Sequence, residues 1–163
     1  MSIRAAEVTD LEALQQLRNH YVVHSFATFD EEPLGREAIQ SWFASLPTAG
    51  PHRLLVAYEN ERLLGYCSSQ AYRTHPAFQR TVETSISVAP EVVRGGIGSA
   101  LYTHLFEVLA NQGLHRAVVG IALPNEASMR PHSKFGFKAV GVFSKYAQKN
   151  GRFISSQWME RAL

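Results

Sequence analysis

The sequence predicts an α/β (α+β) fold in one domain, with a sheet of about seven strands and four helices packed against it. Short apolar runs alternate with amphipathic helical stripes along the chain, which is typical of layered α/β domains. The 163 residues suit one domain with a buried core, and no repeat, low-complexity segment or Pro/Gly/Ser-rich linker divides the sequence. We therefore expect residues 1–163 to form a single domain.

The first third of the chain predicts one strand and two helices. Residues 3–5 form a short apolar run, and residues 25–33 form a polar loop. Between them, Thr9 or Asp10 can cap a helix. The apolar stripe of this helix consists of Leu11, Leu14, Leu17 and Tyr21. A second helix is expected over residues 38–46, where apolar side chains recur at helical spacing.

The middle of the chain predicts three strands. Residues 53–58 and 63–69 are apolar and separated by a short polar turn, which predicts a hairpin. Residues 81–88 predict the third strand, because polar and apolar side chains alternate there. Its apolar face would carry Val82, Ile86 and Val88, and its polar face Glu83, Ser85 and Ser87.

The last third predicts two helices and three strands. The clearest helical stripe covers residues 97–109, and we expect Gly113 to end this helix. A buried strand over residues 117–123 follows, and Asn125 can cap a short helix. The last two strands are expected at residues 138–146 and 153–159.

Composition excludes several classes of protein. A net charge of +2 argues against a polybasic nucleic-acid binder. The single cysteine, Cys67, excludes an intrachain disulfide and a cysteine-based zinc cluster, so we expect no metal. The first residues do not resemble a signal peptide, and no run approaches the ~20 apolar residues that cross a bilayer. We therefore expect a cytoplasmic protein with no membrane or nucleic-acid partner.

A glycine-rich turn lies between the strand at residues 81–88 and the helix at residues 97–109. Gly95, Gly96 and Gly98 would let backbone N–H groups approach a phosphate, and the helix N-terminus adds partial positive charge. The spacing matches neither a phosphate-binding loop that ends in Gly-Lys nor a dinucleotide fingerprint. A turn that only links strand and helix is the alternative interpretation.

Two titratable residues are candidates for proton transfer. Glu83 lies in an otherwise apolar strand, where burial in a cleft would raise its pKa and make it a general base. His132, in the short helix after Asn125, could donate a proton near neutral pH. The alternatives are a solvent-facing strand carboxylate and a histidine that only packs.

Cations and aromatic residues recur around residues 72–80 and 149–152, and an arginine there could hold a carboxylate through two hydrogen bonds. Ordinary surface residues are the alternative. The candidates are Tyr72, Arg73, Phe78, Arg80, Lys149 and Arg152.

The order of these motifs resembles the GCN5-related N-acetyltransferase (GNAT) superfamily, and more closely its phosphinothricin or methionine sulfoximine acetyltransferase group. The matching stretches span almost the full chain. They include the segments 3–6, 19–21, 81–83, 98–104 and 123–128, His132, and Lys149 with Gly151.

The resemblance implies a mixed, mostly antiparallel sheet and acetyl-CoA as co-substrate. The pantetheine arm would lie in a V-shaped gap between the strands at residues 81–88 and 117–123. The implied cofactor-binding residues are Ile86, Ser87 and Val88 on the strand, Val93, Arg94, Gly95, Gly96, Ile97 and Gly98 around the pyrophosphate, and Asn125 and Ser128 beyond.

The resemblance also implies direct transfer of the acetyl group to the amine of a small amino-acid-like acceptor. Glu83 would be the base, a backbone N–H near Val88 would stabilise the oxyanion, and His132 would protonate the departing thiolate. Arg73, Phe78, Thr84 and Lys149 are the implied substrate-binding residues. Relatives are often homodimers, so a homodimer is expected.

Four departures from the family pattern bear on these expectations. Val93 replaces the usual Gln or Arg, Pro131 stands for leucine before His132, and Phe153 and Ser155 replace Trp and Asp. A polyamine or protein N-terminus is the alternative acceptor, and a non-catalytic acyl-CoA sensor is the alternative class of function.

Overall fold

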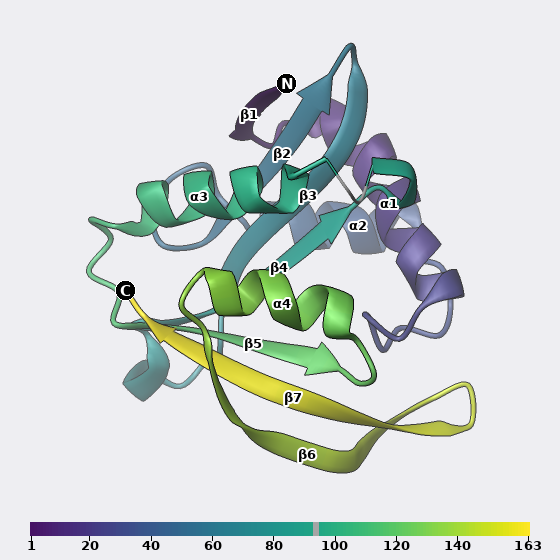
Figure 1. Ribbon diagram of the computed structural model, residues 1–163. Coiled ribbons are helices and arrows are strands. Elements are labelled where there is room, and N and C mark those ends of the chain that lie inside the picture. Colours follow the sequence, from purple (N-terminus) through teal and green to yellow (C-terminus); the bar gives the residue numbers. More distant parts are fainter. Residues whose placement is uncertain (93–94) are drawn as a thin grey trace.

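The computed structural model describes residues 1–92 and 95–163, and within this part of the chain seven strands form one sheet (Figure 1). The strands are β1 (Ser2–Ala5), β2 (Arg53–Glu59), β3 (Arg62–Ala71), β4 (Thr81–Val88), β5 (Arg116–Ala122), β6 (Lys138–Lys149) and β7 (Arg152–Ala162). The helices are α1 (Leu11–His24), α2 (Arg36–Ala44), α3 (Ile97–Leu109) and α4 (Glu126–Lys134).

The strand order is β1-β2-β3-β4-β5-β7-β6, and neighbouring strands are antiparallel except for the parallel pair β4–β5. The predicted α/β fold with a mixed, mostly antiparallel sheet is therefore confirmed. The last two strands extend beyond the predicted ends, because they pair with each other as a long ribbon that reaches Lys149 and Arg152.

Two helices cover each face of the sheet, with α3 and α4 on the side nearest the viewer in Figure 1 and α1 and α2 behind it. On the α3 side, Leu101 and Leu105 are fully buried against Val82 and Ala117. On the α1 side, Leu14 packs in a second cluster with strand residues that include Val56. Burial of each large apolar side chain stabilises the fold by roughly 1.5–3 kcal/mol. The two clusters pack on opposite faces of the sheet, and both include residues of β2 and β3.

Two helix ends differ from the prediction. Asp10 precedes α1, but its carboxylate accepts the Glu7 N–H and pairs with Arg4 instead of capping the helix. Burial alone would raise the pKa of Asp10, and these hydrogen bonds lower it below its usual value. Helix α3 ends at Leu109, and Gly113, with φ of 68°, lies in the following turn.

No helix in residues 1–92 or 95–163 combines the length and apolar character needed to cross a membrane. The same described residues contain no group of three or more His, Cys, Asp or Glu arranged to hold a metal ion.

Candidate active site

The centre of the site is the point where β4 and β5 separate. The two strands pair only from Thr81 to Glu83 on β4, opposite Arg116 to Val118 on β5. On its other edge, β4 stays paired with β3 up to Val88 without a register shift. The part of β4 after Glu83 therefore has one edge free of β5, as the expected V-shaped gap requires.

Glu83 lies at this fork and is half-buried. Its carboxyl group borders two cavities, one of about 300 Å³ beneath α1 and one of about 330 Å³ near Gly120 and Trp158. Burial raises the pKa of Glu83 above its usual value. A carboxylate with a raised pKa beside open space is suited to accept a proton from a bound ligand.

The cavity beneath α1 has a polar floor formed by β3 and β4. Cross-strand partners share one face of a sheet, so Gln70 lies beside Glu83, and Ser68 lies beside Ser85. The two serine hydroxyls are 2.7 Å apart, which confirms that they point the same way. Figure 1 shows α1 crossing behind this part of the sheet.

The glycine-rich turn leads directly into α3. Gly96 has φ of 72° and precedes the first helical residue, a conformation that glycine adopts without strain. Gly98 packs closely on β4, because a Cβ added there would lie 3.4 Å from the Ile86 side chain. These contacts hold the start of α3 against β4. Val93 and Arg94, expected to contact pyrophosphate, lie outside the described residues.

Asn125 caps α4, as its position predicts. Its side-chain oxygen accepts the backbone N–H of Ser128 at 3.1 Å, and both residues lie just beyond the end of β5. The start of α4 therefore faces the same end of the sheet as the start of α3, although each residue's contact with a cofactor stays a prediction.

His132 does not have the free imidazole that a proton donor to a leaving group needs. It is 1% exposed, its Nδ1 lies 2.6 Å from the Ser128 carbonyl oxygen, and its Nε2 lies 2.8 Å from the Tyr102 hydroxyl. Burial lowers the pKa of His132, and the contact with Ser128 only partly offsets this. The geometry makes His132 a buried connection between α3 and α4, and its role as an acid stays a prediction.

Thr84 and Lys149 also lie elsewhere than expected. Thr84 is 2% exposed and points to the α3 face of β4, away from Glu83, because neighbouring strand residues face opposite sides. Lys149 is 1% exposed, and its Nζ donates to the carbonyl oxygens of Val22, Ser25 and Thr28. All three Nζ donors are therefore used within the fold, and direct binding of substrate by Lys149 stays a prediction.

Arg73 and Phe78 lie together in the segment after β3. The Arg73 guanidinium carbon is 5.1 Å from the centre of the Tyr72 ring and 5.5 Å from that of Phe78. Tyr72 in turn contacts Trp158, at 6.0 Å between ring centres, and Trp158 borders the second cavity of Glu83. The Tyr72 ring therefore lies between Arg73 and Phe78 on one side and Trp158 of the cavity wall on the other.

Several residues that line the two cavities beside Glu83 were missed by the sequence analysis. Gln70 could have been found from the hairpin register, but Arg18 and Tyr146 carry no local signal, since they reach the site from a helix and a distant strand. Arg18 lies on α1, where its position resembles that of any surface arginine.

Comparison with known families identifies this arrangement. The family model described as an acetyltransferase (GNAT) domain matches residues 3–158. The fold and this match define an acetyltransferase, and the chain belongs to the GNAT acetyltransferase family. The resemblance inferred from the sequence is confirmed.

Curated relatives are similar over nearly their full length. The chain is 46% identical to a phosphinothricin N-acetyltransferase from Streptomyces coelicolor, over 100% of this chain and 96% of that protein. It is 30% identical to an L-methionine sulfoximine/L-methionine sulfone acetyltransferase from Salmonella typhimurium, over 100% and 95%.

Solved structures agree with the fold. A ribosomal-protein-alanine N-acetyltransferase from Brucella melitensis superimposes with a TM-score of 0.95 at 29% identity, covering all of both chains. The Salmonella typhimurium acetyltransferase yncA, solved with its cofactor acetyl-CoA, has a TM-score of 0.94 at 30% identity, covering 100% of this chain and 94% of that one.

Proposed function

We propose that this enzyme transfers the acetyl group of acetyl-CoA to the amine of a small amino-acid-like acceptor, of the phosphinothricin, methionine sulfoximine or methionine sulfone type. The placement of Glu83 carries the proposal, because it puts one half-buried carboxyl with a raised pKa at the fork between β4 and β5. The names of the relatives support the acceptor class and the co-substrate.

The reaction needs a base because an amino acid's amine is mostly protonated at neutral pH. Glu83 takes the proton from the acceptor ammonium, directly or through a water molecule. The amine nitrogen then attacks the thioester carbon and a C–N bond forms. The nitrogen of the tetrahedral intermediate loses its second proton to water, and the C–S bond breaks to leave the amide. CoA leaves as a thiolate, and solvent supplies its proton, since both ring nitrogens of His132 are engaged within the fold.

The co-substrate would lie along the free edge of β4 and across the start of α3. We assign the pantetheine arm to the backbone of Ile86–Val88, and the oxyanion to a backbone N–H near Val88. The pyrophosphate is assigned to the turn that ends at Gly98, with Asn125 and Ser128 further along.

A covalent route through Cys67 has no support in the structure. Cys67 is fully buried, and its thiol donates only to the Leu101 carbonyl oxygen. Burial raises the pKa of the thiol, so it carries almost no thiolate at neutral pH. Direct transfer is therefore the route we propose.

Arg73 stays our proposed partner for the acceptor's α-carboxylate. It stacks on Tyr72, which contacts Trp158 at the wall of the second cavity.

The release of free CoA thiol from acetyl-CoA tests the proposal. The acceptors are phosphinothricin, methionine sulfoximine, methionine sulfone, spermidine and a short peptide. Turnover with the first three supports an amino-acid acceptor. Turnover with only spermidine or the peptide would refute that acceptor class, and the protein would still be an acetyltransferase. Tight acetyl-CoA binding without turnover on any amine would indicate a sensor.

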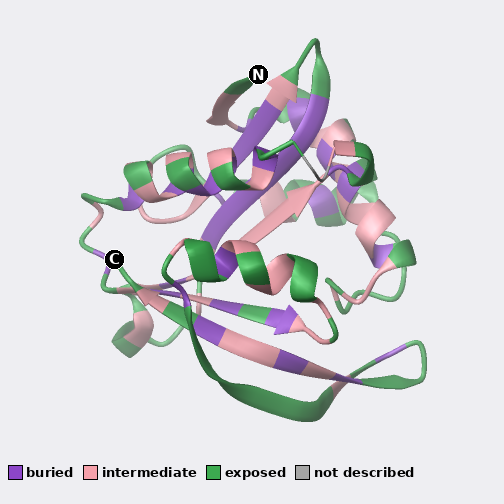
Figure 2. Ribbon diagram, viewed as in Figure 1, coloured by how far each residue is buried: buried purple, intermediate pink, exposed green. Residues whose placement is uncertain are grey.

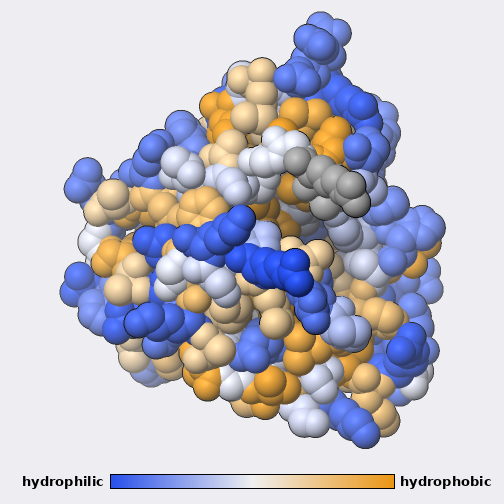
Figure 3. Space-filling model, in the orientation of Figure 1, coloured by the Kyte–Doolittle hydropathy of each residue, from blue (hydrophilic) through white to orange (hydrophobic). Residues whose placement is uncertain are grey.

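We further propose a homodimer that pairs through β6. This edge strand is exposed along almost its whole length (Figure 2). Its exposed residues include large apolar side chains: Val140 is 64%, Val142 51% and Phe143 57% exposed. Figure 3 shows hydrophobic side chains along the same lower edge of the molecule. An exposed apolar edge strand is a typical site of association. Light scattering should give twice 18.2 kDa, and Val142→Glu should give the monomer mass.

A single domain and a cytoplasmic location are also proposals, based on composition and length. Limited proteolysis that leaves the chain in one protected fragment would support the first. Recovery of the protein in the cytoplasmic fraction of its cell would support the second.

A further inference from the structure

Arg18 of α1 lines the cavity beneath this helix. Among the described residues that line this cavity, Arg18 carries the only positive charge and Glu83 the only negative one. Both border the same space of about 300 Å³, so a ligand in it would meet the two charges together. That volume is at the lower end of the range typical of small-molecule sites.

The Arg18 side chain is held in place but not neutralised. Its guanidinium carbon lies 4.2 Å from the centre of the Trp42 ring, a cation–π contact that fixes the planar group. Within residues 1–92 and 95–163, Arg18 forms no ion pair, and its buried Nε has no hydrogen-bond partner. A buried donor without a partner is costly, and a ligand oxygen would remove that cost.

Glu83, Ser85 and Ser87 of β4 all line this cavity. Three residues lie between Glu83 and Ser87, so their Cα atoms are roughly 13 Å apart in an extended strand. Ser87 pairs with Tyr66 on β3, and Tyr66 contacts Trp42 at 5.6 Å between ring centres. This chain of contacts links the Ser87 part of β4 to the Arg18–Trp42 pair.

We propose that Arg18 is a specificity-determining residue that binds an anionic oxygen group at the end of the acceptor side chain, while the acceptor's amine lies at Glu83. This inference rests on the proposed amino-acid acceptor. Arg18 would bind the end of the acceptor side chain, whereas Arg73 is our proposed partner for the α-carboxylate. The polar floor, in which Gln70 and Ser85 follow Glu83, would accommodate a side chain that ends in a charged or strongly polar group.

Two acceptors with the same amine and α-carboxylate provide the test. Phosphinothricin ends in an anionic phosphinate, and methionine sulfone ends in a neutral sulfonyl group. Arginine binds an anionic oxygen more strongly than a neutral one. In Arg18→Gln, we expect kcat/KM for phosphinothricin to fall by about 10- to 100-fold, and the fall to exceed that for methionine sulfone by about tenfold.

Three further measurements make the test specific. Arg18→Lys should restore part of the preference for phosphinothricin because it keeps the charge. Arg36→Gln, at the exposed start of α2, is the matched control and should leave the preference unchanged. Thermal unfolding should show that the variants are folded, and the KM for acetyl-CoA should stay at the wild-type value.

The failures are distinguishable. Equal losses for both acceptors, or no loss in Arg18→Gln, would overturn the role of Arg18. Wild-type turnover of methionine sulfone without phosphinothricin would also overturn it, and the proposed function would stand. Wild-type turnover of neither amino acid, with turnover of spermidine or peptide, would show that the proposed function itself had failed.

Discussion

The Tyr102 hydroxyl lies 2.8 Å from Nε2 of His132, and this hydrogen bond joins α3 to α4 inside the core. Both residues are 1% exposed, and the two rings also meet edge to face with 5.2 Å between their centres. His132 reaches the start of α4 as well, through the Ser128 carbonyl oxygen. The pair therefore connects the two helices proposed to hold the co-substrate.

Replacing His132 by Asn should lower stability far more than it lowers catalysis. The change removes the 2.8 Å hydrogen bond to the Tyr102 hydroxyl, which keeps only its longer 3.4 Å contact with the Thr84 hydroxyl. Loss of a buried hydrogen bond costs about 0.5–1.5 kcal/mol. Loss of a general acid would instead reduce kcat by about 10²- to 10⁴-fold. Urea unfolding and kcat, measured on the same preparation, separate the two roles.

Tyr102→Phe is the matched variant, since it removes the same hydrogen bond from the other side. If the bond only connects the helices, the double variant should lose less unfolding free energy than the sum of the losses in the two single variants. A kcat loss of a hundredfold in His132→Asn, with kcat intact in Tyr102→Phe, would restore the role of His132 as acid.

The second prediction concerns Glu83 and pH. Because burial raises its pKa, kcat/KM should rise with pH as Glu83 loses its proton, at a pH above the usual value for a glutamate. Glu83→Gln should reduce kcat by about 10²- to 10⁴-fold and abolish this rise. The exposed Glu12 is the matched control, and Glu12→Gln should keep the wild-type profile.

The same shift predicts a stability change of opposite sign. A glutamate whose pKa is higher in the folded state binds more protons there, so stability falls as pH rises from the unfolded to the folded pKa. Above the folded-state pKa, the folded protein carries the full cost of the ionised Glu83. The melting temperature of Glu83→Gln, measured relative to wild type, should therefore be higher at pH 7 than at pH 4. The same difference from wild type at both pH values would contradict the raised pKa.

The sequence predicted the elements of the fold well, because each has a local signal. The alternation in residues 81–88 placed β4 and the face of Glu83, and Asn125 marked the start of α4. The same alternation places Thr84 on the opposite face, so proximity in sequence to Glu83 was a poor guide to its role.

Long-range contacts account for what the sequence could not supply. Lys149 looked like a surface cation, yet its partners are more than 120 residues away along the chain. Arg18 acquires its setting from Trp42 on another helix. Burial and partners of charged side chains follow from tertiary packing, which no short motif encodes.

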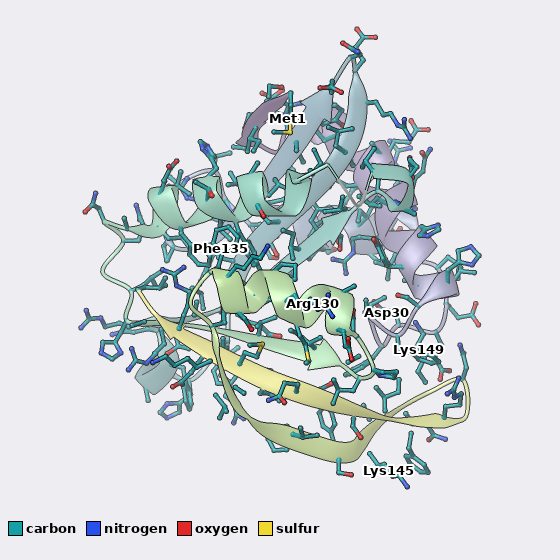
Figure 4. All side chains as sticks on the ribbon, viewed as in Figure 1. Met1, Asp30, Arg130, Phe135, Lys145 and Lys149 are labelled. Atoms are coloured by element: carbon teal, nitrogen blue, oxygen red, sulfur yellow. The ribbon has the colours of Figure 1, made fainter. Side chains whose placement is uncertain are left out.

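The third prediction concerns Lys149, which holds the loop after α1. Figure 4 shows Lys149 close to Asp30 of this loop, whereas Lys145 lies apart from it. Lys149→Met should lower stability by about 1–3 kcal/mol, because the buried Val22 carbonyl loses a charged donor. The loop also carries Thr28, which borders the cavity of Glu83, so the KM for the acceptor should rise more than that for acetyl-CoA.

Lys145→Met is the control for this change. It removes an equal charge from the exposed part of β6 and should leave both KM values and the unfolding midpoint near wild type. Equal effects of the two variants would show that Lys149 acts only through net charge.

The last prediction uses the close approach of β3 and β4 beside the proposed pantetheine site. A Cβ added at Gly65 would lie 2.7 Å from the Ser87 carbonyl oxygen and 3.1 Å from the Val88 Cα, so the β4 backbone must move in Gly65→Ala. Overpacking of this kind costs about 1–3 kcal/mol. Because Ile86–Val88 are proposed to hold the pantetheine arm, the KM for acetyl-CoA should rise more than the KM for the acceptor.

Gly141→Ala is the control, since a Cβ at Gly141 meets nothing within 4 Å. An unchanged KM for acetyl-CoA in a destabilised Gly65→Ala protein would argue that the arm lies elsewhere.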